Sequence, residues 1–238
     1  MGFRTNWKAS FDFPYMGMFL PPLRPEEQWD SFNQRRPSIV SMEAYSRAMR
    51  EQGFRVLNYF NVNEFGTGIK WPPPPSETPA DALWSDANAF LYGPLNEAWL
   101  RDAEGKPVFS WEWSVAMDPG EPAYQVFLLE QAKRHLRYLP SSSGFCIDRL
   151  DWTRWYNKRR DDGASWVEGV PARSLIASWH EVIGKLAPLV HAEGKAIFVN
   201  PLNRRVDLMN HVDGFYDEIA DRPECLNSDA FLGLLKPS

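Results

Sequence analysis

A carboxylate that directly follows a short apolar run is the most suggestive chemical group in the sequence. Residues 144–147 form such a run, Asp148 comes next, and Asp151 lies three residues further on. A carboxylate at the end of a buried strand is held rigidly, and there it can attack an anomeric carbon or stabilise an oxocarbenium ion. The structural alternative is that Asp148 caps the next helix or pairs with Arg149. We predict Asp148 as a catalytic nucleophile and Asp151 as its competitor.

A second acid has to come from another strand end. Glycoside hydrolysis needs one ionised and one protonated carboxyl group around the same bond. Asp217 and Glu218 directly follow the apolar run 212–216. Glu218 reaches further and Asp217 lies closer to the strand, so the sequence does not choose between them; we take Glu218 as the leading acid/base and Asp217 as the reserve. A solvated acidic turn is the structural alternative.

Aromatic and polar side chains gather near the same predicted strand ends. The chain has 11 Trp, 8 Tyr and 15 Phe among 238 residues. Sugar rings have apolar C–H faces that pack on flat aromatic faces, while their hydroxyls need polar partners. We therefore predict a carbohydrate substrate, bound by Asn61, Glu64, Trp111, Trp113, Arg149, Trp152, Asn200 and Tyr216. Two alternatives stay open: a carbohydrate-binding barrel without chemistry, and an interaction domain whose aromatic side chains fill the core.

Other chemistries lack their residues. The four histidines show neither HxH nor HExxH spacing, and the sequence contains no P-loop and no GxSxG motif. We therefore expect no metal site and no cofactor. The formal net charge of -5 argues against a nucleic-acid partner bound by neutralising phosphates. No run approaches the roughly 18 apolar residues of a membrane span. The amino terminus has no apolar signal region, which leaves the compartment open.

Alternating helices and strands must position these groups. Apolar residues recur at helical spacing in three segments, which begin near Ser41, Asp118 and Ser174. Short apolar runs follow these helices, and we predict strands at about 10–19, 54–61, 107–113, 144–148, 195–199 and 212–216. Strands that alternate with helices indicate a parallel sheet. No glycine fingerprint of a dinucleotide-binding fold is present.

A (β/α)8 TIM-barrel type of α/β fold fits this order best, because its functional groups lie at the carboxyl ends of the strands. A whole barrel needs eight units in typically ~250 residues, and about six are recognisable because the long loops 62–106 and 151–173 use much of the length. We predict one catalytic barrel domain over residues 1–238 that stops before its seventh strand. An open doubly wound sheet is the rival fold. Unclosed barrel edges would favour self-association.

The segment GFCID at 144–148 resembles the fourth-strand nucleophile motif of the alpha-amylase family, Gly-Phe-Arg-hydrophobic-Asp. The stretch from Asp118 to this strand is similar to the corresponding region of retaining alpha-galactosidase-like barrels. This resemblance implies a glycoside hydrolase-like barrel with Asp148 as the nucleophile. Two positions depart from the amylase pattern: Cys146 replaces the arginine, and Asn200 with Pro201 replaces the fifth-strand glutamate. The resemblance to the alpha-galactosidase clan implies that the acid/base lies after strand six. We therefore expect this chain to be a distant relative of the two families and a member of neither.

Overall fold

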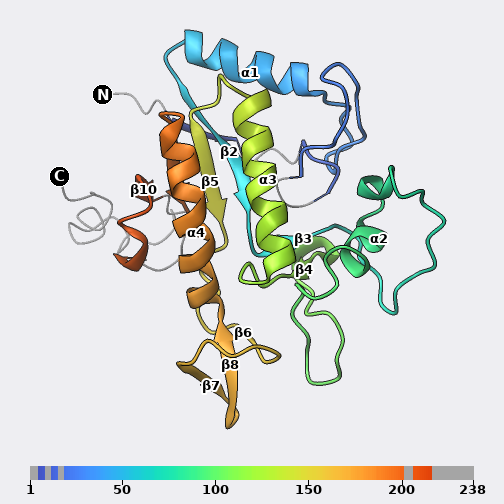
Figure 1. Ribbon diagram of the computed structural model, residues 1–238. Coiled ribbons are helices and arrows are strands. Elements are labelled where there is room, and N and C mark those ends of the chain that lie inside the picture. Colours follow the sequence, from blue (N-terminus) through green and yellow to red (C-terminus); the bar gives the residue numbers. More distant parts are fainter. Residues whose placement is uncertain (1–4, 9–11, 16–18, 201–205, 216–238) are drawn as a thin grey trace, which may run out of the picture.

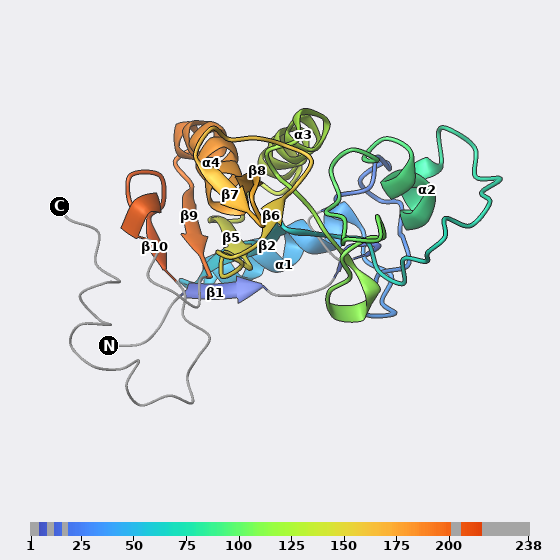
Figure 2. The same ribbon diagram turned by 90° about the horizontal axis from the view of Figure 1, so that it is seen from below.

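A curved parallel sheet forms the centre of the molecule. The computed structural model describes residues 5–8, 12–15, 19–200 and 206–215. Five parallel strands lie in the order β1-β2-β5-β9-β10, with the bounds Thr5–Lys8, Arg55–Asn61, Gly144–Asp148, Ala196–Val199 and Gly214–Phe215. The order follows the chain without reversal, whereas a doubly wound sheet reverses its strand order. The sheet curls into a half-barrel, so the predicted incomplete α/β barrel is confirmed (Figure 2).

Three long helices connect the strands. They are α1 (Ile39–Glu51), α3 (Pro122–Tyr138) and α4 (Leu175–Ala192), and a short 3-10 turn, η3 (Val206–Leu208), precedes β10. Local sequence explains their starts: Ser38 forms a capping box with Ser41, Pro122 opens α3, and Ser174 accepts a hydrogen bond from the N–H of Ala177. Helices α3 and α4 lie side by side along the sheet (Figure 1). All three helices are predicted by the sequence.

The core lies between these helices and the sheet. Trp179 of α4 is fully buried, and the rings of Phe60 and Phe145 on neighbouring strands lie 4.8 Å apart. Burying one large apolar side chain stabilises the fold by about 1.5–3 kcal/mol. Gly144 has a φ of 138°, and a Cβ built there would lie 1.8 Å from the carbonyl oxygen of Ala196. Only glycine therefore allows β5 to approach β9 this closely at the start of the strand.

Two predicted strands are absent from the sheet. The described residues of the run 10–19 form no strand, and the first described strand is β1, nearer the amino terminus. The apolar character of this run has another cause: Phe13 and Tyr15 lie in a loop and pack into the core from there. The run 107–113 forms only isolated bridges and a 3-10 turn, η2 (Trp111–Trp113), so β2 pairs directly with β5. Asp148 therefore ends the third described strand of the sheet rather than the fourth, and residue 217 follows the fifth rather than the sixth.

The long loops contain structure of their own. The insertion after β2 holds β3 (Glu64–Phe65), paired antiparallel with β4 (Val115–Ala116), together with η1 (Leu83–Ser85) and α2 (Ala87–Tyr92). The insertion after β5 forms a three-stranded antiparallel sheet in the order β6-β8-β7, with the bounds Tyr156–Asn157, Val170–Ser174 and Ser165–Val167. Both insertions lie at the carboxyl end of the parallel sheet (Figure 1).

None of the helices in the described part of the chain combines the length and the apolarity that a membrane span requires. Within the described residues, β1 pairs only with β2 and β10 only with β9. Self-association through these two edges stays a prediction.

Candidate functional site

Asp148 lies where three neighbouring strands end. It is the last residue of β5, in register with Asn61 of β2, and 9% of it is exposed. Asn200 follows β9 directly, and its Nδ2 donates a hydrogen bond of 2.8 Å to Oδ1 of Asp148. The backbone N–H of Asn200 donates to the carbonyl oxygen of Ile147 at 2.8 Å, which fixes the approach of the two strand ends. The structure thus brings together two of the residues that the sequence singles out.

Tyr59 is a part of this cluster that the sequence reasoning missed. It stands two residues before Asn61 on the same face of β2, and its oxygen accepts a hydrogen bond of 2.9 Å from Nδ2 of Asn61. Burial raises the pKa of Tyr59 well above its usual range, and the negative charge of Asp148 and a hydrogen bond to that carboxylate add to the effect. The hydroxyl therefore stays neutral and can donate to Asp148. The two-residue period of a strand could have predicted this position, because it places Tyr59 and Asn61 on the same face of β2.

Glu64 is buried in a second part of the same network. Its Oε2 accepts a hydrogen bond of 2.7 Å from Nδ2 of Asn61, and its Oε1 accepts from the hydroxyls of Ser110 at 2.5 Å and Ser114 at 3.3 Å. The side-chain oxygen of Asn61 accepts the backbone N–H groups of Asn63 and Glu64. The network therefore runs from Asp148 to the loop that carries Ser110, and Asn61 and Glu64 are held by protein partners within it.

Arg149 and Trp152 form a stack beside Asp148. Arg149 has a φ of 63°, and its carbonyl oxygen accepts a hydrogen bond from the side-chain amide of Asn63. Its guanidinium lies 3.4 Å from Asp151 and 5.1 Å from the ring of Trp152. Trp152 is only 5% exposed and stacks on Trp155 at 4.2 Å. Asp151 is thus engaged in an ion pair, and the Trp152 ring is mostly covered.

The remaining predicted residues fall into two groups. Trp111 and Trp113 are 52% and 64% exposed on the insertion after β2, which is the exposure that a ligand-stacking role requires. Tyr216, Asp217 and Glu218 lie outside the described residues. The described part of β10 ends at Phe215, in register with Val199 and therefore next to the strand end that carries Asn200.

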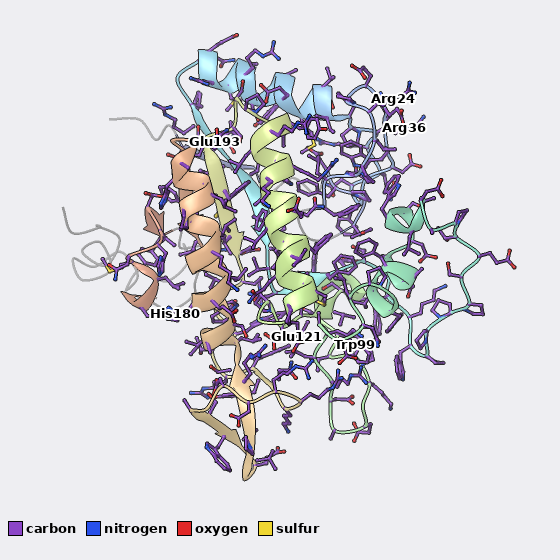
Figure 3. All side chains as sticks on the ribbon, viewed as in Figure 1. Arg24, Arg36, Trp99, Glu121, His180 and Glu193 are labelled. Carbon is purple, nitrogen blue, oxygen red and sulfur yellow. The ribbon has the colours of Figure 1, made fainter. Side chains whose placement is uncertain are left out.

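A buried charge cluster holds the two insertions together, and the sequence reasoning missed it. The carboxylates of Asp118 and Glu121 are almost fully buried. Asp118 accepts hydrogen bonds from Ser178 of α4 at 2.5 Å and from Asn157 at 2.8 Å, and Arg173 lies 3.6 Å away. Glu121 accepts from Arg160 at 2.6 and 2.9 Å, and Figure 3 shows its position at the start of α3.

The hairpin after β5 is also fixed by a carboxylate, Asp162, and this predicts a pH dependence. Desolvation acts to raise the pKa of Asp162, but hydrogen bonds from the backbone of Ser174 and Ala164 and from both donors of Ser165 outweigh it and hold that pKa well below its usual range. A carboxyl group with a depressed folded-state pKa stabilises the fold above its unfolded pKa, about 3.9, and loses this contribution as the pH falls below that value.

We therefore expect Asp162→Asn to lower the midpoint of thermal unfolding most at pH 7. The difference from the wild type should shrink steadily below about pH 4, because the wild type then loses the same contribution. Circular dichroism melting curves at pH 7 and pH 3 measure this difference. A difference that is the same at both pH values would contradict the assignment.

Two of the hollows that the described residues form lie at opposite ends of the molecule. One of about 580 Å³ lies at the amino-terminal end of the sheet and is lined by Arg55, Ser143, Lys195 and other residues, so it is remote from Asp148. The other, of about 600 Å³, lies on the insertion after β2. Within the described ranges, no group of three or more His, Cys, Asp or Glu side chains is placed to hold a metal ion.

Comparison with known proteins supports the fold. No family model and no curated protein matches the chain. A cycloisomaltooligosaccharide glucanotransferase from Paenibacillus sp., solved with cycloisomaltoheptaose, matches 90% of this chain with 10% identity and a TM-score of 0.58. The glycoside hydrolase domain of PelA from Pseudomonas aeruginosa matches 74% with 18% identity and a TM-score of 0.49. The alpha-galactosidase of Thermus thermophilus matches 79% with 15% identity and a TM-score of 0.45.

These likenesses cover only a part of the matched structures. The chain spans 29%, 55% and 31% of their respective lengths. At such identities a likeness shows the fold alone. The inference about the fold rests on the glucanotransferase, which has the highest TM-score of the three. The predicted resemblance to glycoside hydrolase-like barrels is thereby confirmed at the level of the fold alone.

Proposed function

We propose that this chain is a glycoside hydrolase-like domain that cleaves O-glycosidic bonds, with Asp148 as the nucleophile and Glu218, or in reserve Asp217, as the acid/base. The observation that carries the proposal is the position of Asp148 at the carboxyl end of a buried parallel strand. Catalytic residues of α/β barrels come from this end of the strands. We also propose that residues 1–238 belong to one catalytic barrel domain.

The surroundings of Asp148 suit a nucleophile. Asn200 donates to one carboxylate oxygen, and the Tyr59 hydroxyl is a second neutral donor beside it. Neutral donors fix the orientation of a carboxylate while leaving its charge available to an electron-poor carbon. In the first step an oxygen of Asp148 would bond to the anomeric carbon as the glycosidic bond breaks, and the acid would give its proton to the departing oxygen.

The second step would regenerate the enzyme. The former acid, now ionised, would take a proton from water, and the resulting hydroxide would attack the anomeric carbon and release Asp148. A mechanism of this retaining type requires the two carboxyl groups to be about 5–5.5 Å apart, and an inverting one about 6.5–9.5 Å.

The acid/base assignment predicts a dependence on the leaving group. Glu218→Gln should slow hydrolysis of an alkyl glycoside by about 10²–10⁴-fold, because its leaving oxygen needs a proton. A 2,4-dinitrophenyl glycoside should be affected far less at the glycosylation step, since its leaving group departs without protonation. Steady-state kinetics with both substrates measure this contrast.

Asp217→Asn is the matched control for that experiment. It should change both rates only a few-fold, whereas the reverse pattern would transfer the role to Asp217. Equal rates for the wild type and both variants on every substrate would contradict an acid/base at either position.

A carbohydrate-binding barrel without chemistry is the second candidate. The exposed indoles of Trp111 and Trp113 favour ligand binding whether or not the acids converge. Glycan binding that survives the double variant Asp148→Asn/Glu218→Gln, in a protein whose wild type hydrolyses no glycoside, would favour this candidate. A purely structural role for the aromatic side chains fits Trp152, which is buried, but not Trp113.

A further inference from the structure

A groove between two tryptophans crosses the insertion after β2. Trp71 is 39% exposed and Trp113 is 64% exposed, and the hollow between them is about 600 Å³. This volume is within the range of small-molecule sites. Besides the two indoles, the lining includes Lys70, the ring of Phe109 and two prolines. Among the described residues of this lining, Lys70 is the one ionisable side chain and no carboxylate is present.

The Trp71 wall is supported from behind by other rings. The Trp71 ring lies 5.8 Å from that of buried Trp99 and 6.0 Å from that of Tyr92. The Tyr92 hydroxyl donates to the carbonyl oxygen of Lys70 at 2.8 Å, and the backbone N–H of Lys70 donates to the side chain of Asn88 at 2.8 Å. Figure 3 shows Trp99 near the start of α3, at the same end of the molecule as Glu121. Trp71 is therefore exposed on one face while its position is fixed.

The Trp113 wall stands on a strained turn. Glu112 and Trp113 have φ values of 54° and 56°, and residues other than glycine rarely adopt this conformation. Such strain persists only where the surroundings hold it, and it is concentrated at functional sites. Here the backbone N–H groups of Gly68 and Ile69 donate to the carbonyl oxygens of Glu112 and Trp113, each at 3.0 Å. The segment that leads into Trp71 thus holds the turn of Glu112 and Trp113 in its strained conformation.

Glu64 fixes the base of the same turn. Ser110 and Ser114, whose hydroxyls both donate to Oε1 of Glu64, directly follow Phe109 and Trp113 in the chain. The rings of Phe109 and Trp113 pack edge to face at 5.5 Å. Through Asn61, the other oxygen of Glu64 belongs to the network that contains Tyr59 and Asp148. A network of hydrogen bonds therefore links the turn that carries Trp113 to the candidate active site.

We propose that this groove is a subsite for an uncharged pyranose unit of a glycan chain, and that Glu64 is a positioning residue that holds Trp113 in place. The proposal rests on the proposed function, which makes the ligand a glycan. Two indole faces match the apolar faces of a sugar ring, and the described residues of the lining include no carboxylate with which a positively charged ligand would pair. The strained turn exposes Trp113 to solvent, so the indole does not serve to fill the core.

The binding of oligosaccharides is measured in the Asp148→Asn protein, because loss of the proposed nucleophile should prevent their hydrolysis during the measurement. The probes are maltohexaose, cellohexaose and mannohexaose, and the readout is isothermal titration calorimetry. For the probe that binds, Trp71→Ala and Trp113→Ala should each weaken binding about tenfold. Trp166→Ala is the matched control, since Trp166 is 66% exposed on the hairpin after β5 and lies outside the groove. It should leave the dissociation constant unchanged.

The role of Glu64 is tested by kinetics in the Asp148-containing protein. Ser110→Ala removes one hydrogen bond of Glu64 without altering its charge, and it should raise KM several-fold with kcat and the pH profile unchanged. Glu64→Gln keeps an acceptor for the two serines and should lose less affinity than Glu64→Ala. Circular dichroism melting confirms that each variant is folded. A fall in kcat for Ser110→Ala at unchanged KM would overturn the positioning role.

The outcomes separate the subsite from the catalytic assignment. Weaker binding in the tryptophan variants, with turnover intact in Asp148→Asn, would support the subsite and reject the nucleophile. Unchanged binding in Trp71→Ala and Trp113→Ala would overturn the subsite even if Asp148 proves essential. Binding of none of the three probes to the Asp148→Asn protein, or preferential binding of an apolar peptide, would also overturn it.

Discussion

Asp148→Asn is expected to slow the hydrolysis of an aryl glycoside by a factor of about 10³ or more. The substitution replaces a carboxylate oxygen by an amide nitrogen of almost the same size, so it removes the nucleophile without leaving a cavity. The remaining amide oxygen can still accept the hydrogen bond from Asn200, which joins the ends of β5 and β9. The fold should therefore persist while turnover is lost. Initial rates over a panel of aryl glycosides measure the effect.

Two further variants make this result specific. Asp151→Asn removes the carboxylate that pairs with Arg149 and tests the competing nucleophile. Asp81→Asn changes an exposed loop carboxylate of the insertion after β2 and should leave turnover unchanged. Loss of turnover in Asp151→Asn, with Asp148→Asn active, would transfer the role to Asp151.

Asp118→Ala is expected to lower the free energy of unfolding by about 3–5 kcal/mol. Asp118 is fully buried and accepts hydrogen bonds from Asn157 and Ser178, with Arg173 3.6 Å away. Removing the carboxylate leaves the Asn157 and Ser178 donors without their acceptor in a poorly hydrated place and takes away one of the two carboxylates that face Arg173. Urea unfolding followed by circular dichroism measures the change.

Asp30→Ala provides the control for that loss. Asp30 also has an arginine partner, with 3.3 Å between its Oδ1 and Nε of Arg36, but both side chains are largely exposed. An exposed pair contributes about 0–1 kcal/mol. If Asp118→Ala cost no more than Asp30→Ala, the cluster would not hold the insertions together.

The sequence predicts the regular part of the fold because regular elements have a period. The apolar residues of α1, α3 and α4 recur at helical spacing, and β5 is a short apolar run that ends at a charged residue. The described residues of the runs 10–19 and 107–113 lie in loops, isolated bridges and a 3-10 turn, from which aromatic side chains reach the core without a ladder of strand hydrogen bonds. Composition alone does not distinguish such loops from strands.

The candidate site is predictable only where it follows strand ends. Asp148 and Asn200 are singled out by their places after apolar runs, and the structure joins them. Tyr59 was missed inside a strand, although strand alternation places it beside Asn61. The partners of Asp118 are distant in sequence, and no local pattern relates Asn157 or Ser178 to it. Long-range polar contacts of this kind depend on tertiary packing.

Covalent trapping identifies the residue that attacks the anomeric carbon, which we propose is Asp148. A 2-deoxy-2-fluoroglycoside with a good leaving group, of the sugar that the wild type hydrolyses, slows both steps and lets the glycosyl-enzyme accumulate. Mass spectrometry of the intact protein and of its peptides locates the added sugar. We expect one fluorosugar per chain, attached to Asp148 and absent from Asp148→Asn. A label on Asp151 or any other residue, or an active enzyme that remains unlabelled, would contradict it.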